Sequence, residues 1–302
     1  MRNLKKALSL VLASATLVGM VSVGASAADF SDKESINHTE AVETVSTLGI
    51  INGLPDGSYG PDQLVDRASM AKMITLALNG GSEPILGTKT TPTYSDIKGT
   101  WAETYIEYCS SMGIIAGDGQ GRFNPTGTIT GSQAAKMLLV ALGYDSTVFG
   151  FTGADWEINT NREANDAGLY DGLEGLQASA ALSRDDAAQM IYNALNAFVM
   201  EKTPTKNSDG TTSYTYDLSK NTTLLSQKFG AKVFVGTFDG NSNSLSLKDG
   251  NVQVTGKLTT ETEGSKTATF PADIAIANIG EEYKVIFKDG TGGVANQPDS
   301  KD

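Results

Sequence analysis

The sequence predicts a multidomain α+β protein in which a helical bundle of three helix-loop-helix repeats precedes a small antiparallel β domain. Two observations support this prediction. Segments of the first repeat recur without a gap 64 residues further along the chain. Beyond residue 213, the spacing of apolar residues changes from a helical period to a period of two. The first observation predicts stacked helical units, and the second predicts strands.

The first 27 residues have the composition of a secretory signal peptide. Three basic residues precede an apolar run from Ala7 to Val23, and Ala25-Ser26-Ala27 supplies a cleavage site. No later segment approaches the roughly 20 apolar residues that a membrane-spanning helix requires. We therefore expect a secreted protein that begins near Ala28 and has no membrane span after cleavage.

Charge and composition exclude several classes of partner and chemistry. The signal peptide contains three of the 23 basic residues and none of the 35 acidic ones, so the mature chain is strongly acidic and nucleic acid is not an expected partner. Cys109, the single cysteine, lies in an apolar helical segment and is expected to be a buried, inert thiol. His38 has no cysteine or second histidine with which to bind zinc, so we expect no metal and no cofactor.

The first two repeats are expected at residues 28–90 and 91–147, where their motifs align without a gap. The matching segments, first repeat before second, are 30–32 and 94–96, 49–53 and 113–117, 57–61 and 121–125, and 71–73 and 135–137. A third, degenerate repeat is expected at 148–200, because Gly168-Leu169-Tyr170-Asp171-Gly172 repeats the glycine spacing with a loop two residues shorter. Three stacked copies can bury the apolar faces that two helices leave exposed.

Each repeat is predicted to be a helix, a loop and a second helix. In the second repeat, Trp101, Tyr105, Cys109 and Met112 recur at helical spacing, and Phe123 is expected to fold back into the loop as an apolar plug. The last helix is expected from about Arg184 to Phe198.

The C-terminal third changes in composition. Residues 201–213 are polar with no apolar period and predict a linker, followed by a β domain at 214–288. Strands are expected around Val233, Val252, Ile274 and Val285, with a hairpin turn at 248–251, and the tail 289–302 is expected to be disordered. We expect 28–200 to fold alone and proteases to cut first between Thr203 and Ser213.

One four-residue motif recurs at the start of each second helix. It reads 66–69 (DRAS), 130–133 (TGSQ) and 183–186 (SRDD). Asp66, Thr130 and Ser183 are good helix caps, and Thr130 with Gln133 predicts a capping box. Capping does not account for an arginine in the first turn, where it opposes the helix dipole. If only one helix start had such an arginine, we would interpret it as a solvated surface residue. Two equivalent positions, Arg67 and Arg184, favour a site in which the guanidinium and free backbone amides receive a carboxylate.

These motifs resemble S-layer homology domains. The shared elements are aromatic-Ser-Asp, Trp-Ala, Gly-Ile-Ile-x-Gly, Gly-x-Phe-x-Pro and a second helix that starts in the manner of Ile-Thr-Arg-Ala-Glu. The resemblance covers about Asp29 to Val199, is specific for the first two repeats and moderate for the third, and does not extend beyond Thr203.

The resemblance implies a pseudo-threefold bundle at the cell wall or S-layer, whose inter-repeat grooves bind an acidic secondary cell-wall polysaccharide or another peptidoglycan-linked polymer. It implies that the arginine of the helix start meets a pyruvate carboxylate, a role that falls on Arg67 and Arg184, whereas the second repeat departs from the pattern with Gly131. The groove of Gly131 is therefore expected to be weak, and Gly131→Arg to strengthen binding, or to leave it unchanged if that groove is lost for other reasons. The capping residues Asp66, Thr130 and Ser183 are further candidates for binding the polysaccharide. Both arginines are expected at the surface, so that their removal would not unfold the protein.

Two tryptophans are further candidates for sugar binding. Trp101 and Trp156 hold equivalent positions, and an indole beside a groove can stack on a sugar ring. Their helical spacing also favours packing of at least one face in the core.

Other functions fit the sequence less well. The segment 118–122 resembles a calcium loop, but Arg122 occupies a ligand position. Acidic residues are scattered, and one histidine cannot be placed beside a nucleophile, so we do not expect an enzyme. The main alternative is a lattice or adhesion protein that acts through protein contacts, with other S-layer subunits as partners.

Overall fold

The computed structural model describes residues 15–18, 30–85, 91–271 and 279–288. The chain divides into two compact units. One is a helical unit that ends at Ala231, and the other is a sheet unit that joins the strand at 15–18 to the residues from Lys232 onward. The predicted α+β class is confirmed. Within the described ranges, no helix has the length and apolar character needed to cross a membrane.

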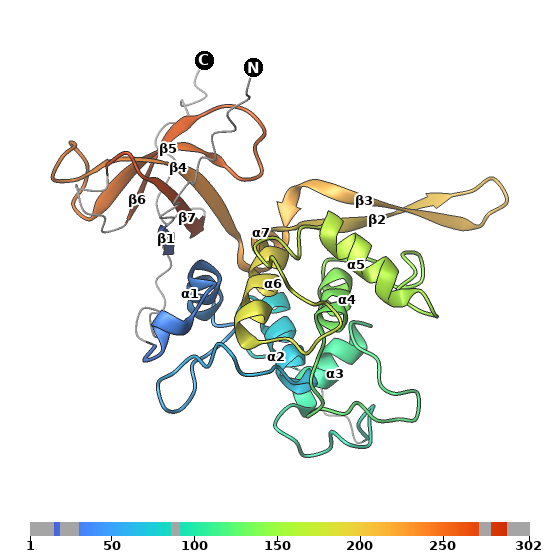
Figure 1. Ribbon diagram of the computed structural model, residues 1–302. Helices are drawn as coiled ribbons and strands as arrows, with labels where there is room; N and C mark the ends of the chain where they lie inside the picture. The colour runs from blue at the N-terminus through green and yellow to red at the C-terminus, as the bar shows by residue number, and fades with distance from the viewer. Residues whose placement is uncertain (1–14, 19–29, 86–90, 272–278, 289–302) are drawn as a thin grey trace, which may run out of the picture. The chain divides into compact units, whose positions relative to one another are not determined.

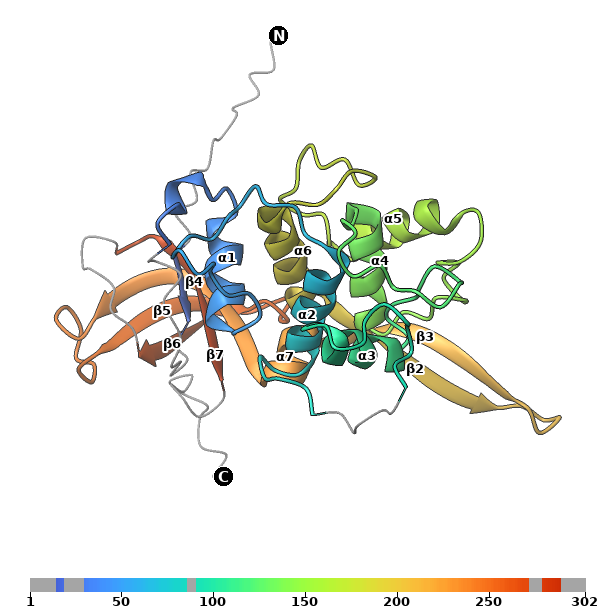
Figure 2. The same ribbon diagram turned by 90° about the horizontal axis from the view of Figure 1, so that it is seen from below.

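The helical unit contains one pair of helices from each repeat (Figure 1). The pairs are α1 (Thr39–Thr47) with α2 (Arg67–Leu78), α3 (Glu103–Ser111) with α4 (Gly131–Ala141), and α5 (Trp156–Asp166) with α6 (Arg184–Asn196). The first helix of each repeat packs against the second helix of the preceding repeat: α3 on α2, α5 on α4, and α1 on α6. Figure 2 shows the same neighbours from below. The three repeats therefore close into a ring.

The centre of this ring is a triangle of backbone hydrogen bonds. The amide of Val65 donates to the carbonyl of Leu182 (2.9 Å), that of Leu182 to Ile129 (2.9 Å), and that of Ile129 to Val65 (3.0 Å). All three side chains are buried, and each precedes the cap of a second helix. Equivalent residues thus meet at a pseudo-threefold axis.

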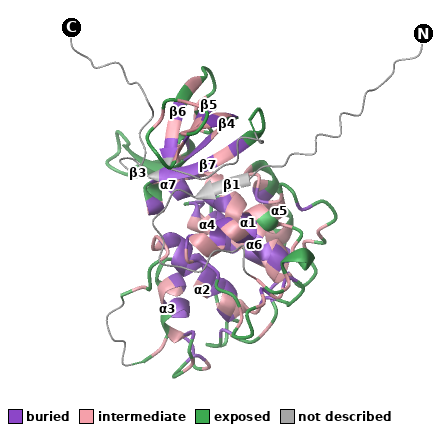
Figure 3. Cartoon of the chain, turned by 90° about the vertical axis from the view of Figure 1, so that its left-hand side faces the viewer, coloured by how far each residue is buried: buried purple, intermediate pink, exposed green. Residues whose placement is uncertain are grey.

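Burial is uneven among the helices (Figure 3). In α2, nine of the 12 residues are buried, whereas in α5 only Thr160 and Ala164 are buried. Cys109 lies within α3, fully buried against the Thr75 hydroxyl at 3.3 Å, and burial raises the pKa of its thiol to about 12. This confirms the expectation of an inert cysteine. The polar composition of α5 accounts for the weaker repeat signal of the third copy.

The aromatic-Ser-Asp motif holds the loop of its own repeat in place. Asp32 accepts hydrogen bonds from the amides of Tyr59 (2.7 Å) and Gly60 (2.8 Å). Asp96 accepts the equivalent bonds from Phe123 (2.8 Å) and Asn124 (2.7 Å). Burial alone would raise the pKa of each carboxyl, but the backbone hydrogen bonds outweigh it, so both pKa values are lowered.

Loss of this clamp is expected to destabilise the helical unit in acid. Because the folded-state pKa of Asp32 and Asp96 is lowered, their stabilisation is complete above the unfolded pKa of about 3.9 and is lost as the pH falls through the folded pKa. Asp32→Asn and Asp96→Asn should each cost about 1–3 kcal/mol at pH 7 and flatten the acid dependence of the urea midpoint. Asp62→Asn, at an exposed position in the same loop, is the matched control. An unchanged pH profile in both clamp variants would contradict the assignment.

Residues 201–213 are not the linker that their composition predicts. They lie in a hairpin of β2 (Phe198–Lys206) and β3 (Thr212–Thr223), with pairs from Met200↔Leu218 to Lys206↔Thr212. A short helix, α7 (Leu224–Phe229), follows and packs on α6 and α2. The helical unit therefore extends to Ala231, and the sheet unit begins at Lys232 and not at Tyr214. The helix α6 ends at Asn196, two residues earlier than predicted, because β2 starts at Phe198.

We accordingly expect the helical unit to fold well only when α7 is included. Leu224 and Leu225 are each 1% exposed and Phe229 is 7% exposed, so a chain that ends at Met200 loses three buried side chains, each worth about 1.5–3 kcal/mol. Residues 28–231 should show a higher urea midpoint than 28–200. Shortening the exposed hairpin between Pro204 and Ser213 should change the midpoint little. Equal stability of the two truncated chains would refute this boundary.

The sheet unit is a five-stranded sheet in the order β1-β7-β4-β5-β6. Its strands are β1 (Ala15–Val18), β4 (Ala231–Asn241), β5 (Asn251–Leu258), β6 (Lys266–Pro271) and β7 (Glu282–Lys288). β5 pairs antiparallel with β4 and β6, whereas β1 pairs parallel with β7. The predicted strands around Val233, Val252 and Val285 are present. The predicted strand at Ile274 and the tail lie outside the described residues.

The described core of this sheet lies on β4 to β7. Its buried cluster includes Phe234, Phe238, Val252, Val254, Ala268, Phe270, Tyr283, Val285 and Phe287. β1 lies within the predicted signal peptide, so cleavage at the predicted site would remove it and leave β7 at an edge of the sheet.

Candidate functional site: two equivalent grooves

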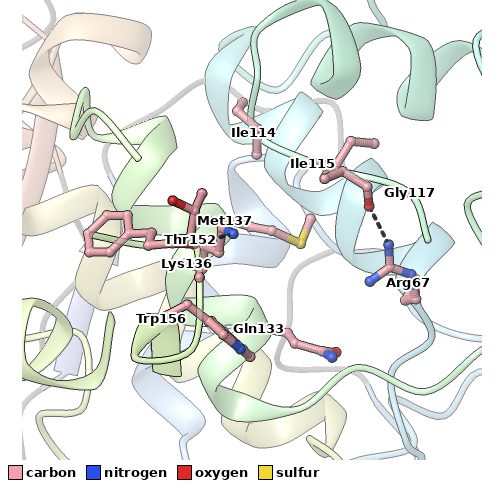
Figure 4. A pocket seen from close by; sticks show the side chains of 12 residues that line it. Arg67, Ile114, Ile115, Gly117, Gln133, Lys136, Met137, Thr152 and Trp156 are labelled. Atoms are coloured by element: carbon pink, nitrogen blue, oxygen red, sulfur yellow. Dashed lines mark hydrogen bonds between the residues drawn. The ribbon is translucent and has the colours of Figure 1, made fainter. Parts of the chain in front are cut away.

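Two grooves of the helical unit are built from equivalent residues of three repeats each. The first groove, about 230 Å³, is lined by the loop 50–54 with Ser69, Lys72 and Met73 of α2, by Trp101 of the second repeat and by Arg184 of the third. The second groove, about 280 Å³, is lined by the loop 114–117 with Gln133, Lys136 and Met137 of α4, by Arg67 of the first repeat, and by Phe151, Thr152, Gly153 and Trp156 of the third (Figure 4). Each groove therefore contains one arginine, one lysine and one tryptophan.

Arg67 joins the first repeat to the second. Its Nε donates to the carbonyl of Phe123 (2.9 Å) and its Nη2 to that of Ala116 (3.0 Å), the latter drawn in Figure 4. The guanidinium carbon lies 4.4 Å from the centre of the Phe123 ring. Burial lowers the pKa of Arg67. Nε and Nη2 are the guanidinium atoms that make these hydrogen bonds. The same side chain lines the second groove.

Arg184 makes the same contacts between the third repeat and the first. Its Nε donates to the carbonyl of Tyr59 (3.0 Å) and its Nη2 to that of Asn52 (3.1 Å), with the guanidinium carbon 4.9 Å from the Tyr59 ring centre. The Tyr59 hydroxyl donates in return to the carbonyl of Arg184 (2.9 Å). The two arginines are therefore equivalent in their contacts as well as in sequence.

The backbone amides at these helix starts are already occupied, which corrects the prediction that they receive a carboxylate. The amide of Arg67 donates to the carbonyl of Gly127 (2.9 Å) and that of Ala68 to Pro125 (2.9 Å). The amide of Ser69 donates to the Asp66 side chain (2.7 Å). The first-turn amides of α4 and α6 are bonded in the same way, because each helix start docks on the loop of the next repeat. An anion in a groove would therefore not be bound by these helix-start amides.

Three of the predicted site residues cap helices. Asp66, Thr130 and Ser183 accept a hydrogen bond from the third residue of their helices, and Thr130 forms the predicted capping box with Gln133. None of the three lines either groove, whose walls instead include Ser69 and Gln133 from the capped turns.

The two tryptophans stand at the groove walls. Trp101 is 61% exposed and its ring centre lies 6.1 Å from that of Tyr105. It is more exposed than its spacing predicts because α3 starts only at Glu103. Trp156 is the first residue of α5, is partly buried, and has the Lys136 ammonium 5.6 Å from its ring centre.

The groove lysines were missed as site residues, although a signal for them exists in the sequence. Lys72 and Lys136 are the central residues of the repeated Ala-Lys-Met segments. The Lys136 ammonium donates to the carbonyl of Phe151 (2.6 Å), and burial lowers its pKa. The Lys72 ammonium lies 5.3 Å from the centre of the Tyr105 ring. Apolar periodicity does not require a lysine at this position, so its repetition is the signal.

The third inter-repeat interface lacks these features. Gln189 stands where the other repeats have lysine, Asn37 and His38 occupy the positions of the Trp-Ala pair, and Gly131 occupies that of the arginine. The buried Asp185 accepts the amides of Asn37 (2.8 Å) and His38 (3.3 Å). This interface therefore has a carboxylate in place of the cations of the other two, and a carboxylate would repel an anionic ligand.

The surroundings of Gly131 argue against the expectation that an arginine at this position would restore a groove. A Cβ at this position would lie 3.1 Å from the Cα and carbonyl oxygen of Ala178, which is closer than an ordinary contact. The third repeat has a shorter loop and Leu176 in place of the aromatic residue on which the other arginines lie. Any side chain at 131 would therefore press on the adjoining repeat.

Comparison with known proteins identifies the family of the first two repeats. The family model of the S-layer homology domain matches residues 29–71 and 93–135. The chain therefore contains two S-layer homology domains, and the third helical pair is not matched by the family model.

Curated relatives are proteins of the bacterial surface. The chain is 28% identical over 270 residues to a "Cell surface protein" of Thermoanaerobacter kivui, covering 87% of this chain and 33% of that protein. It is 31% identical over 197 residues to "S-layer protein EA1" of Bacillus anthracis, covering 62% and 22%. An uncharacterized cell wall amidase of the same organism matches over 100 residues with 34% identity, covering 33% and 18%. The chain thus spans a third or less of these relatives, and it is assigned to the cell surface as an S-layer-type protein.

Proposed function

We propose that this chain attaches non-covalently to the cell wall by binding an acidic, pyruvylated secondary polysaccharide in its first and second grooves. The observation that carries the proposal is the charge of the two grooves. The whole chain has a formal net charge of −12, yet the described residues that line each groove include one arginine and one lysine and no acidic residue. Two local cations in an acidic protein favour an anionic ligand at that place.

The remaining groove residues fit a sugar. Trp101 and Trp156 offer indole rings beside the cations, and an aromatic face can pack against the apolar face of a sugar ring. Arginine and lysine together can hold a carboxylate by charge-assisted hydrogen bonds. The carboxylate at the third interface supports a proposal of two binding grooves per chain and not three.

The alternative function is a lattice or adhesion protein that uses the repeats for protein contacts. The amidase relative does not bring a catalytic role to this proposal, because the match covers 18% of that protein and the described lining residues of the grooves include no cysteine, histidine or carboxylate. Wall binding that depends on the polysaccharide distinguishes anchoring from protein contacts.

The test is sedimentation of the mature protein with purified sacculi before and after acid extraction of the attached polysaccharide. We expect binding to intact sacculi only. Lys72→Gln with Lys136→Gln should weaken binding by at least about tenfold, since each change removes a groove cation. Lys98→Gln, an exposed lysine outside both grooves, is the matched control for charge. Equal binding to extracted sacculi would overturn the proposal.

A further inference from the structure

The hairpin of β2 and β3 has open edges on both strands. It forms a sheet of two strands, with no third strand among the residues that the structure describes. Residues 201–215 are exposed without exception, and the hairpin extends away from the helices (Figure 1). A two-stranded hairpin is at best marginally stable in water, and its open edge groups are a template for another strand.

The base of the hairpin is fixed to the helical unit. The amide of Met200 donates to the carbonyl of Leu142 (2.8 Å), and the Tyr216 hydroxyl donates to Asp145 (3.0 Å). The Tyr216 ring also packs edge-on against Phe149, with ring centres 5.9 Å apart. The outer half is therefore held in a defined direction and is not a free tail.

The two edges differ in chemistry. β2 has Lys202, Pro204 and Lys206, which are residues that block pairing at an edge. In β3, residues 212–217 (TSYTYD) have no lysine and no proline, and most of them are β-branched or aromatic. Only the β3 edge is therefore suited to accept a strand.

The pairing register shows which β3 amides face outward. The amide of Asn207 donates to the carbonyl of Thr211 (2.9 Å), which makes these two residues a hydrogen-bonded pair. Such pairs alternate along an antiparallel ladder, so the pair Pro204↔Tyr214 is not hydrogen-bonded, as the missing N–H of Pro204 requires. The amide of Tyr214 thus points away from β2.

We propose that β3 pairs antiparallel with β3 of a second copy of this chain, which joins the two hairpins into a four-stranded sheet about a twofold axis. Charge selects the second copy as the occupant. Residues 201–220 contain three acidic and three basic residues, whereas the whole chain has a net charge of −12, so two copies approach here without the repulsion expected elsewhere. One strand serves both sides of a twofold interface, and six residues form a ladder of about 20 Å. This inference does not depend on polysaccharide binding.

The test is sedimentation velocity of the mature chain, without polysaccharide, over about a hundredfold range of concentration. Wild type should show a concentration-dependent dimer. Tyr214→Pro removes an outward amide without removing a hairpin hydrogen bond and should raise the dimer dissociation constant by at least about tenfold. Tyr214→Val removes the ring but keeps the amide, and should leave the dimer in place.

Each outcome decides the proposal. A monomeric wild type overturns it and leaves the β3 edge to a strand of another protein. A dimer that withstands Tyr214→Pro lies on another surface and also overturns it. Because the proline variant could lose its hairpin, hydrogen exchange of the wild type is a second test. The amides of Thr212 and Tyr214 should become protected from exchange as the protein concentration rises. Absence of this protection would refute pairing at β3.

Discussion

Replacing Arg67 and Arg184 together by alanine is expected to remove most wall binding and also to lower the stability of the helical unit. Each guanidinium makes two hydrogen bonds to backbone carbonyls of another repeat and lies over an aromatic ring. A charge-assisted hydrogen bond is worth about 1.5–3 kcal/mol, so each groove should lose about ten- to a hundredfold in affinity. The same change removes four hydrogen bonds between repeats, two of them partly buried, so the urea midpoint should fall as well. From the sequence, by contrast, both arginines were expected at the surface, where their removal would not destabilise the fold.

Two controls separate binding from folding in this variant. Arg162→Ala removes an arginine that is 61% exposed and paired with Glu163 on α5, and it should affect neither property measurably. Arg67→Lys with Arg184→Lys keeps the charge but loses the planar fork, so it should recover part of the binding and little of the stability. Binding is measured well below the urea midpoint of the weaker variant. A folded alanine variant that sediments with sacculi like wild type would contradict the role of the arginines.

The repeat structure could be predicted from sequence because its signals are local and repeated. The equivalence of Arg67 and Arg184 follows from aligning the first repeat with the third. The helix caps at Asp66, Thr130 and Ser183 follow from residue type. Phe123, 2% exposed, is the buried plug that its motif predicts. In each case a short segment contains the whole signal.

Contacts between repeats could not be predicted in this way. The occupied amide of Arg67 depends on the carbonyl of Gly127, sixty residues away, and no local pattern reports that bond. The position of Gly131 against Ala178 is set by the shorter loop of the third repeat in the same manner. The predicted contribution of the helix-start amides to an anion site was wrong, because these amides are already hydrogen-bonded to the next repeat or to their own cap.

The hairpin was missed because its outer part has no buried face. A strand is recognised by apolar residues alternating with polar ones, and β2 is exposed at six consecutive residues, Glu201–Lys206. The available signal was a different one: Asn207-Ser208-Asp209-Gly210 supplies turn residues, and threonine-rich segments flank it on both sides. Turn chemistry between β-branched segments therefore predicts this hairpin better than apolar period does.

Leu182→Ala is expected to cause the largest loss of stability of any single change considered for this chain. The Leu182 side chain is fully buried at the centre of the ring, where its backbone bonds to Val65 and Ile129. Truncation of a buried leucine costs about 2–5 kcal/mol. Leu64→Ala is the matched control, because Leu64 adjoins the same triangle but is 56% exposed, and it should cost less than about 0.5 kcal/mol.

The variant also tests whether the three repeats unfold as one unit. Trp101 belongs to the second repeat and Trp156 to the third, so Trp101→Phe and Trp156→Phe backgrounds report each repeat separately by fluorescence during urea unfolding. Because every repeat donates and accepts one hydrogen bond of the central triangle, Leu182→Ala should move both reporters to the same lower midpoint. A shift confined to the Trp156 signal would show that the third repeat unfolds alone. Since each groove combines residues of three repeats, joint unfolding also requires that both grooves lose wall binding at one urea concentration.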